Sequence, residues 1–348
     1  MSAPVTPAAT QARDLLRRAE RWQIWEIGLW LVAVGAIFVL PSHMLILTEI
    51  AILALLAVSL DLILGYAGIV SLGHAAFFGL GAYAAGLFAK HAVTEPVTGL
   101  LFAGVISGLF GLASSFLVLR GSDLTRLMTT FGVAMLLAEL VNQTAWLTGG
   151  ADGLSGVTIA PILGLFEFDL WGRTGYIYAL TVLIVLTFIA RRIVNSPYGL
   201  SLKAIKRNTT RAAMLGISPN RRIVVIYTIA AAYAGMAGAL LTQTTSFVSP
   251  DVLAFHRSAD VLLVLVLGGV GYLYGGILGA VIFTVLRDWL SVITPQYWMF
   301  WIGLILVIIV MIGRERVTRW QALLPGSAAS RDLKARKAAQ AAASGNSP

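Results

Sequence analysis

The sequence contains no cysteine and few charged residues. The lack of cysteine excludes disulfides, thiolate metal sites and cysteine nucleophiles. Charged residues make up 12% of the 348 residues, whereas soluble domains carry about 25%. Hydrophobic residues make up 58%, and the mean hydropathy is +0.85. This composition predicts a membrane protein that crosses the bilayer several times.

Motifs for catalysis and nucleotide binding are also missing. No G-x-x-x-x-G-K-[ST] phosphate loop occurs, so the chain does not bind ATP by that route. No His-Glu-x-x-His motif or Ser-His-Asp grouping stands out, and the four histidines are scattered. We therefore expect no catalytic residue, no metal site and no cofactor in this chain. Energy for uphill transport would have to come from a partner ATPase or an ion gradient.

Apolar segments dominate residues 25–313. A helix needs about 20 apolar residues to cross the bilayer. Ten segments are candidates: 25–41, 44–64, 69–90, 97–119, 126–148, 174–190, 223–246, 259–270, 273–291 and 297–313. We predict an all-α polytopic membrane protein with about ten transmembrane helices. The segments 1–24 and 314–348 would be cytoplasmic tails, the second largely disordered.

Basic residues fix the orientation of this topology. Four Lys/Arg lie in 1–24, eight in 191–222 and seven in 314–348. Ten crossings place all three segments on one side, as expected where cytoplasmic segments carry the excess of Lys/Arg. The net charge of +9 is therefore a topology signal, and we predict no binding of nucleic acid.

The central loop 191–222 contains no Asp or Glu. Ser196 is a good N-cap and Pro197 suits the first helical position, while Gly216 is well placed to end a helix. The sequence predicts one amphipathic helix of about five turns, with three basic residues on one face at i, i+4 and i+8: Lys203, Arg207 and Arg211. Such a helix could lie on anionic lipid or dock on a cytoplasmic partner.

Glycine-rich stretches interrupt the apolar segments in both halves of the chain. Glycines allow close helix packing, which explains most of them. Two interrupted helices in corresponding positions are also typical of a translocation site. We expect the path to involve Gly68 in the first stretch and Gly268, Gly269 and Gly271 in the second.

Polar side chains within apolar segments are the other candidates for the path. Burying a charge in hydrocarbon costs roughly a few kcal/mol, so such residues mark functional sites by default. The candidates are Asp61, His74, Glu139, Asn142 and Gln143. The alternative is that each forms an interhelical hydrogen bond that stabilises the bundle.

Four ordered motifs resemble one transporter family. They are GYAGIVSLGHAAFFGLGAYAAG at 65–86, LTGGADGLSGV at 147–157, AIKRNTTRAAMLGI at 204–217, and SFVSPDVLAFHRSADVLLVLVLGGVGYLYGGILGA at 246–280. Together they are similar to the M-type transmembrane permease of bacterial branched-chain amino-acid ABC importers. The resemblance covers roughly residues 44–313.

The resemblance implies a set of partners in the bacterial inner membrane. A second homologous permease would complete the pore, two cytoplasmic ATPases would bind ATP, and an external binding protein would deliver substrate. The loop 191–222 would couple to the ATPases through Lys203, Lys206, Arg207, Arg211, Ala212, Ala213 and Gly216. The family commonly carries acidic residues where this chain has Arg207 and Thr209, so the ATPase groove would need complementary acids.

The substrate and the energy source have alternatives. Similar permeases also serve urea, short amides and aromatic compounds. An ion-coupled secondary transporter would use intramembrane carboxylates, for which Asp61, Glu139 and Asp260 are available. It would have no use for a capped basic helix in the central loop.

Overall fold

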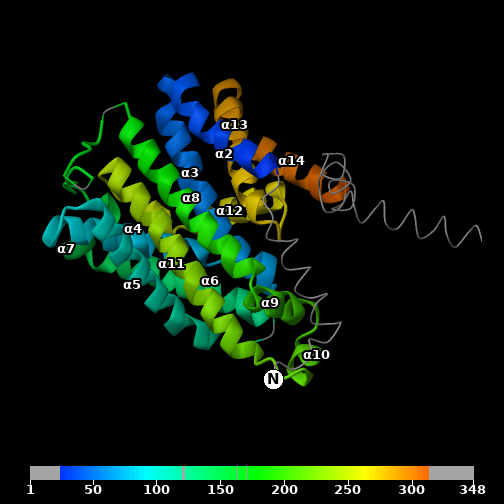
Figure 1. The fold of residues 1–348 in the computed structure, drawn as a ribbon. Helices are drawn as coiled ribbons and strands as arrows, with labels where there is room; N and C mark the ends of the chain where they lie inside the picture. Colours follow the sequence, from blue (N-terminus) through cyan, green and yellow to red (C-terminus); the bar gives the residue numbers. More distant parts are fainter. Residues whose placement is uncertain (1–23, 120, 122, 163, 170, 313–348) are drawn as a thin grey trace, which may run out of the picture. The chain divides into compact units, whose positions relative to one another are not determined.

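Most of the described part of the chain is helical. The computed structural model describes residues 24–312 apart from 120, 122, 163 and 170. Within these residues there are helices and two isolated bridge pairs but no strands, which confirms the all-α class (Figure 1). The predicted tails, apart from Ile24, lie outside the described residues.

The described residues fall into two compact units. The larger holds residues 28–284, and the smaller holds 24–27 with 285–312. The smaller unit contains the second half of α13 and all of α14. All candidate site residues belong to the larger unit, and the contacts described below lie within it.

Each predicted apolar segment overlaps an observed helix. The α-helices are α2 (Ile24–Val39), α3 (Met44–Asp61), α4 (His74–His91), α5 (Pro96–Val118), α6 (Asp123–Gln143), α7 (Ala145–Thr148), α8 (Arg173–Asn195), α9 (Pro197–Arg207), α10 (Thr209–Met214), α11 (Pro219–Thr245), α12 (Phe255–Gly268), α13 (Leu273–Ile293) and α14 (Trp298–Ile312). Short 3₁₀ turns are η1 (Pro41–His43), η3 (Gly150–Asp152) and η4 (Pro250–Leu253), and η2 (Leu62–Ala67) is a π-helix.

Six described helices are long and apolar enough to cross a membrane. They are Pro41–Ala67, Pro96–Val118, Leu124–Gln143, Arg173–Asn195, Pro219–Thr245 and Leu273–Ile293. The structure thus establishes a multi-pass helical protein. The count of ten crossings and the cytoplasmic placement of both termini stay predictions.

Small residues bring α11 into close contact with its neighbours. This helix packs against α3, α4 and α5. A Cβ atom at Gly81 of α4 would collide with the backbone of Gly235, and one at Gly238 would collide with the carbonyl of Phe78. Helices in membranes associate by such close approach, because lipid provides little hydrophobic drive. The larger unit is therefore centred on α11.

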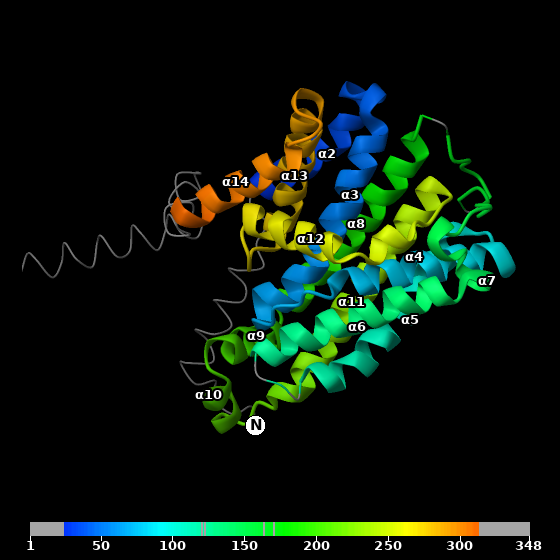
Figure 2. The same ribbon diagram turned by 180° about the vertical axis from the view of Figure 1, so that it is seen from behind.

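The central loop and α7 lie at opposite ends of this unit. Helices α8 and α11 run side by side between α9 and α10 at one end and α7 at the other (Figure 2).

Candidate functional site

Both glycine-rich stretches break a helix. The first helix, α3, continues into the π-helix η2 and stops at Gly68, which has a φ of 77°. The chain is then irregular until α4 begins at His74. The second break follows α12, where Gly269 and Gly271 have φ values of 100° and 85° before α13 begins. Positive φ favours glycine because it carries no Cβ atom.

The two breaks meet at Asp61. Its Oδ1 atom accepts a hydrogen bond of 2.7 Å from the backbone N–H of Gly271. A Cβ atom at Gly65 would collide with the Asp61 carboxylate and would lie 2.7 Å from the Gly271 nitrogen. The Asp61 side chain is fully buried. A carboxylate from one half of the chain thus binds the interrupted backbone of the other half.

His74 lies at the start of α4 and is fully buried. Its Nε2 atom is 2.7 Å from Ser59 Oγ, whose own hydroxyl donates to the Leu56 carbonyl. The Ser59 hydroxyl thus lies between the His74 ring and the Leu56 carbonyl. The next residue, Ala75, donates its backbone N–H to Ser258 Oγ of α12 at 3.0 Å. The first turn of α4 is therefore held by both broken segments.

The polar residues of α6 do not join this cluster. Glu139, Asn142 and Gln143 are exposed, and Gln143 Nε2 donates to Glu139 Oε1 across 2.7 Å. This pair spans one turn of the same helix, so it ties α6 to nothing else. The candidates for the path thus separate into a group at the breaks, where Asp61, His74 and Gly268 are buried, and an exposed group on α6.

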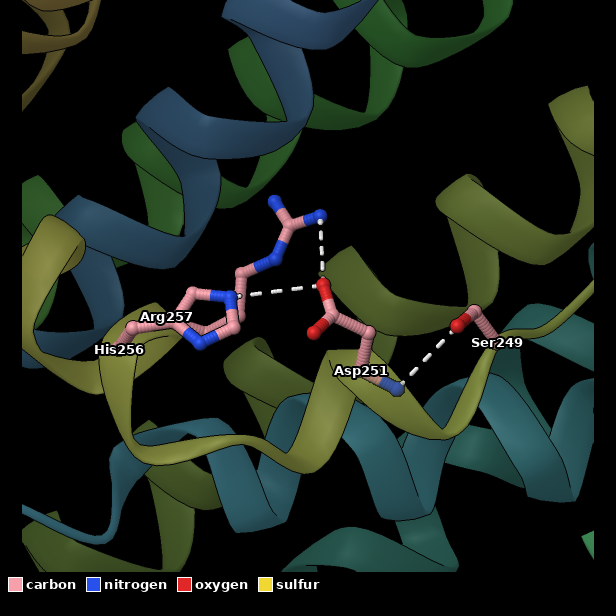
Figure 3. A network of polar contacts seen from close by, with 4 residues as sticks. All are labelled: Ser249, Asp251, His256 and Arg257. Carbon is pink, nitrogen blue, oxygen red and sulfur yellow. Dashed lines mark hydrogen bonds and ion pairs between the residues drawn. The ribbon is translucent and has the colours of Figure 1, made fainter. Parts of the chain in front are cut away.

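A charged network lies close to the second broken segment. Asp251 Oδ2 is 3.4 Å from His256 Nε2 and 3.7 Å from an Arg257 guanidinium nitrogen (Figure 3). Ser249 Oγ accepts from the Asp251 backbone N–H at 3.2 Å and caps η4. The side chains of Asp251 and His256 are about half exposed. These residues lie between two predicted apolar segments, 223–246 and 259–270, and nothing in their spacing predicted this network.

The central loop forms two helices where one was predicted. Asn208, between α9 and α10, has an extended backbone with φ −161° and ψ 105°, and its Oδ1 accepts from the Arg211 backbone N–H at 2.8 Å. An asparagine side chain competes with the helix for backbone N–H groups, so it ends α9 and caps α10. The predicted caps are present, since Ser196 accepts from Gly199 and Gly216 has a φ of 80°.

The break at Asn208 also removes the predicted single basic face. Alignment at i, i+4 and i+8 requires a continuous helix, so Lys203 does not share a face with Arg211. Arg207 and Arg211 are exposed, as is Ala213, whereas Ala212 is buried. Met214 and Leu215 follow with 82% and 74% of their surface exposed. Helix α10 thus presents an apolar and basic surface.

The two lysines of α9 lie against the first break instead. Lys206 Nζ donates to the Gly65 carbonyl at 2.6 Å, and Lys203 Nζ lies 5.3 Å from the centre of the Tyr66 ring. Partial burial lowers the pKa of Lys203 from its usual value, because desolvation disfavours the ammonium form. The predicted coupling residues therefore divide into an inward pair on α9 and an outward pair, Arg207 and Arg211.

Helix α9 is also tied to the start of α11. Tyr198 Oη donates to the Arg222 carbonyl at 2.6 Å, and an Arg222 guanidinium nitrogen donates to Ser201 Oγ at 2.7 Å. Leu202 and Ile205 are buried on the same helix. The helix is thus fixed along its length to the membrane-spanning part of the chain.

Buried Arg191 is a further residue that sequence reasoning missed. Its guanidinium donates to Tyr274 Oη at 3.0 Å, at the start of α13 just after the second break. The sequence assigned this arginine to the central loop as one of eight basic residues. Its length and planar fork let it reach back into the helical bundle, and no local pattern could reveal that.

Comparison with known proteins places these features in one family. The family described as "Branched-chain amino acid transport system / permease component" matches residues 43–310. The high-affinity branched-chain amino acid transport system permease protein LivM of Salmonella typhimurium is 30% identical over 302 residues, which is 80% of this chain and 69% of that protein.

Two further relatives cover less of the chain. The corresponding permease protein LivH of Escherichia coli is 23% identical over 257 residues, 66% of this chain and 78% of the relative. The ribose import permease protein RbsC of Bacillus subtilis is 26% identical over 211 residues, 55% of this chain and 62% of the relative. No solved structure gives a significant match.

Proposed function

Because the chain belongs to the family of branched-chain amino acid transport system permease components, we propose that it forms half of the translocation pathway of an ABC importer for branched-chain or related amino acids. It is a multi-pass protein of the bacterial inner membrane. The partners of this importer would be a second permease subunit, two cytoplasmic ATPases and an external binding protein.

A continuous line of contacts through the larger unit carries this proposal. The exposed surface of α10 is covalently joined to α9, and Lys206 of α9 holds the Gly65 carbonyl at the first break. Gly65 and Asp61 in turn contact Gly271 at the second break. A movement applied to α10 by an ATPase would therefore reach both interrupted helices. An ion-coupled transporter needs no such line.

The pathway would run beside the two breaks. Irregular backbone at membrane depth must be buried in protein or line a water-filled path. Its wall would include Asp61, Gly68, His74, Gly268, Gly269 and Gly271. The half-exposed network around Asp251 borders the same region, because Ser258 binds the start of α4 one residue after Arg257. Charged groups beside membrane-spanning helices are stable where water or a partner covers them.

The exposed polar residues of α6 support a place for the second permease subunit. Glu139 and Gln143 would be costly in contact with lipid, by roughly 2.5–3.5 kcal/mol for a charge at the centre of a helix. A facing subunit could hydrogen-bond to them and to Asn142. We therefore assign α6 to the interface that completes the pore.

The proposed substrate is inferred from the names of similar proteins. Those with the greatest identity are named for branched-chain amino acids, and a weaker one is named for ribose. Leucine, isoleucine and valine are therefore the first choice. Urea, short amides and aromatic compounds are the alternatives. The pore itself needs only weak affinity, because an external binding protein selects the substrate.

Reconstitution tests the proposal. This chain is placed in proteoliposomes with the second permease subunit and the two ATPases of the proposed importer, and leucine uptake is measured with the external binding protein. We expect uptake that requires ATP. Arg207→Glu combined with Arg211→Glu should abolish uptake and binding of the ATPase, because it reverses the charge of the outward surface.

The matched control is Arg221→Glu, which changes an exposed arginine outside α10 and should retain uptake. Uptake that continues without ATP in an energised membrane would exclude the ABC importer. An ATPase that binds the double variant unchanged would exclude α10 as its docking surface. Uptake of amides or aromatic compounds in place of leucine would contradict the proposed substrate but not the proposed class of importer.

A further inference from the structure

Lys206 acts as a cap for a helix that is not its own. The helix formed by α3 and η2 ends at Ala67, so its last carbonyls lack intrahelical donors. The ammonium group of Lys206 donates to one of them, the Gly65 carbonyl, at 2.6 Å. A cation at the C-terminal end of a helix is also favoured by the helix dipole. A residue of the cytoplasmic loop thus completes the end of a broken intramembrane helix.

The glycines at the first break leave space for this contact. A Cβ atom at Gly68 would lie 2.8 Å from Lys206 Cγ, so the lysine stem runs directly against that glycine. A Cβ atom at Gly65 would displace Asp61 and the Gly271 backbone from the other side. Lys206, Gly65 and Gly271 therefore form one packed sequence of contacts, in which the Asp61 carboxylate also takes part.

The neighbouring basic residues do not share this position. Lys203 lies over the Tyr66 ring and adds a second inward contact from α9. Arg207 directly follows Lys206, and both residues are exposed at the end of α9, but the Lys206 ammonium reaches back to the Gly65 carbonyl. The two adjacent cations thus face different surroundings, which allows their roles to be separated by matched substitutions.

We propose that Lys206 is a positioning residue that holds the junction of the two breaks closed and transmits movement of α9 to it. This inference rests on the proposed function for the source of the movement, but the holding contact itself is independent of any partner. Withdrawal of α9 would remove the cation from Gly65. The freed end of η2 could then separate from Gly271, and the path beside Asp61 would open toward the cytoplasm.

A single engineered cysteine can report this opening, because the chain has none of its own. Ser71 is buried in the irregular segment after η2, and Ser71→Cys is nearly isosteric. The full-length chain is labelled in inverted membrane vesicles with a membrane-impermeant maleimide. Ser71→Cys is the junction reporter. Its labelling rate is measured in the otherwise native chain and in chains that also carry Lys206→Met, Lys206→Arg or Arg207→Met.

We expect Lys206→Met to speed labelling of the junction reporter by roughly ten- to a hundredfold, the change in equilibrium that loss of one hydrogen bond from a charged group produces. Lys206→Arg should restore the slow rate, because it keeps a cation that can donate to Gly65. Arg207→Met should label as slowly as the native background.

A reporter elsewhere distinguishes opening of the junction from general loosening. Ser107 is fully buried on α5, where its hydroxyl donates to the Phe77 carbonyl. Ser107→Cys should stay unlabelled in the Lys206→Met background. Equal labelling of the junction reporter with and without Lys206, or faster labelling of both reporters, would overturn the proposal.

The second part of the proposal, transmission of movement from the ATPase to the junction, has its own readout. In the assembled importer, Lys206→Met should keep the ATPase bound yet lower the leucine transported per ATP hydrolysed, and Lys206→Arg should restore that ratio. An unchanged ratio in Lys206→Met would overturn the role in transmission. If the native chain binds no ATPase at all, the proposed function fails while the labelling result still decides the contact.

Discussion

Asp61 and Glu139 are both carboxylates within apolar helices, and the structure gives them opposite surroundings. Asp61 is fully buried and accepts a hydrogen bond from Gly271 in the other half of the chain. Glu139 is exposed on α6 and is bound by Gln143 of the same helix. A polar residue in a membrane segment thus marks a junction within the chain in one case. In the other it marks a surface that a partner must cover.

The most damaging change to the buried region should be Gly65→Ala. The new Cβ atom would collide with Asp61 and the Gly271 backbone, which cannot move aside cheaply. We expect a loss of about 3 kcal/mol, the upper part of the usual range for overpacking. Thermal unfolding in mild detergent measures the loss.

Gly132→Ala is the matched control on α6. No atom lies within 4 Å of a Cβ atom at this position. Alanine is the better helix former by about 1 kcal/mol, so this variant should be as stable as the native chain or slightly more so. Equal melting temperatures for the two glycine variants would contradict the close contact between the breaks.

Asp61→Leu should have the next largest effect. It removes the charged acceptor of the partly buried Gly271 N–H, which costs about 1–3 kcal/mol. Asp61→Asn keeps an oxygen acceptor and should lie closer to the native chain in melting temperature. If the leucine variant were as stable as the asparagine variant, the hydrogen bond to Gly271 would not hold the breaks together.

Ser59→Ala should cost less, about 1 kcal/mol, because one neutral hydrogen bond to His74 is lost. The chain offers a control in Ser42, whose hydroxyl lies 2.9 Å from His43 Nδ1 at an exposed site. Ser42→Ala should leave the melting temperature unchanged, since water replaces the bond. A larger shift for Ser42→Ala than for Ser59→Ala would contradict the buried role of His74.

Glu139→Leu should have the smallest effect on the chain by itself. Its partner Gln143 is exposed, so neither side chain holds α6 to another helix. The loss should show instead as weaker co-purification of the second permease subunit, with Glu139→Gln retaining most of the binding. If Glu139→Leu lowered the melting temperature of the isolated chain but left subunit binding unchanged, Glu139 would stabilise the chain itself, as Asp61 does, and would not mark a subunit interface.

Helix positions could be predicted from the sequence because apolar runs of membrane length leave few alternatives. The glycine-rich stretches likewise predicted breaks near Gly68 and Gly269, where positive φ is needed. The division of the central loop into α9 and α10, in contrast, could not be predicted from the sequence. Whether Asn208 stays within a helix or caps a new one depends on a single competition between side chain and backbone.

Side-chain directions were beyond the sequence. Lys206 and Arg207 are adjacent cations with the same pattern around them, and only the packing of Leu202 and Ile205 turns one toward Gly65. Asp61 and Glu139 were equal candidates for the same reason. Burial in this protein is decided by which helices contact each other across hundreds of residues, and local periodicity carries little of that information.

The most direct test of the account is the accessibility of the junction during transport. In the assembled importer, the variants Ser71→Cys and Asn142→Cys are labelled with a maleimide added to both sides of the membrane, first without nucleotide and then with ATP trapped by vanadate. We predict that the labelling rate of Ser71→Cys changes severalfold between the two states while that of Asn142→Cys stays constant. A constant rate for Ser71→Cys with a changing rate for Asn142→Cys would contradict the assignment of the breaks to the pathway.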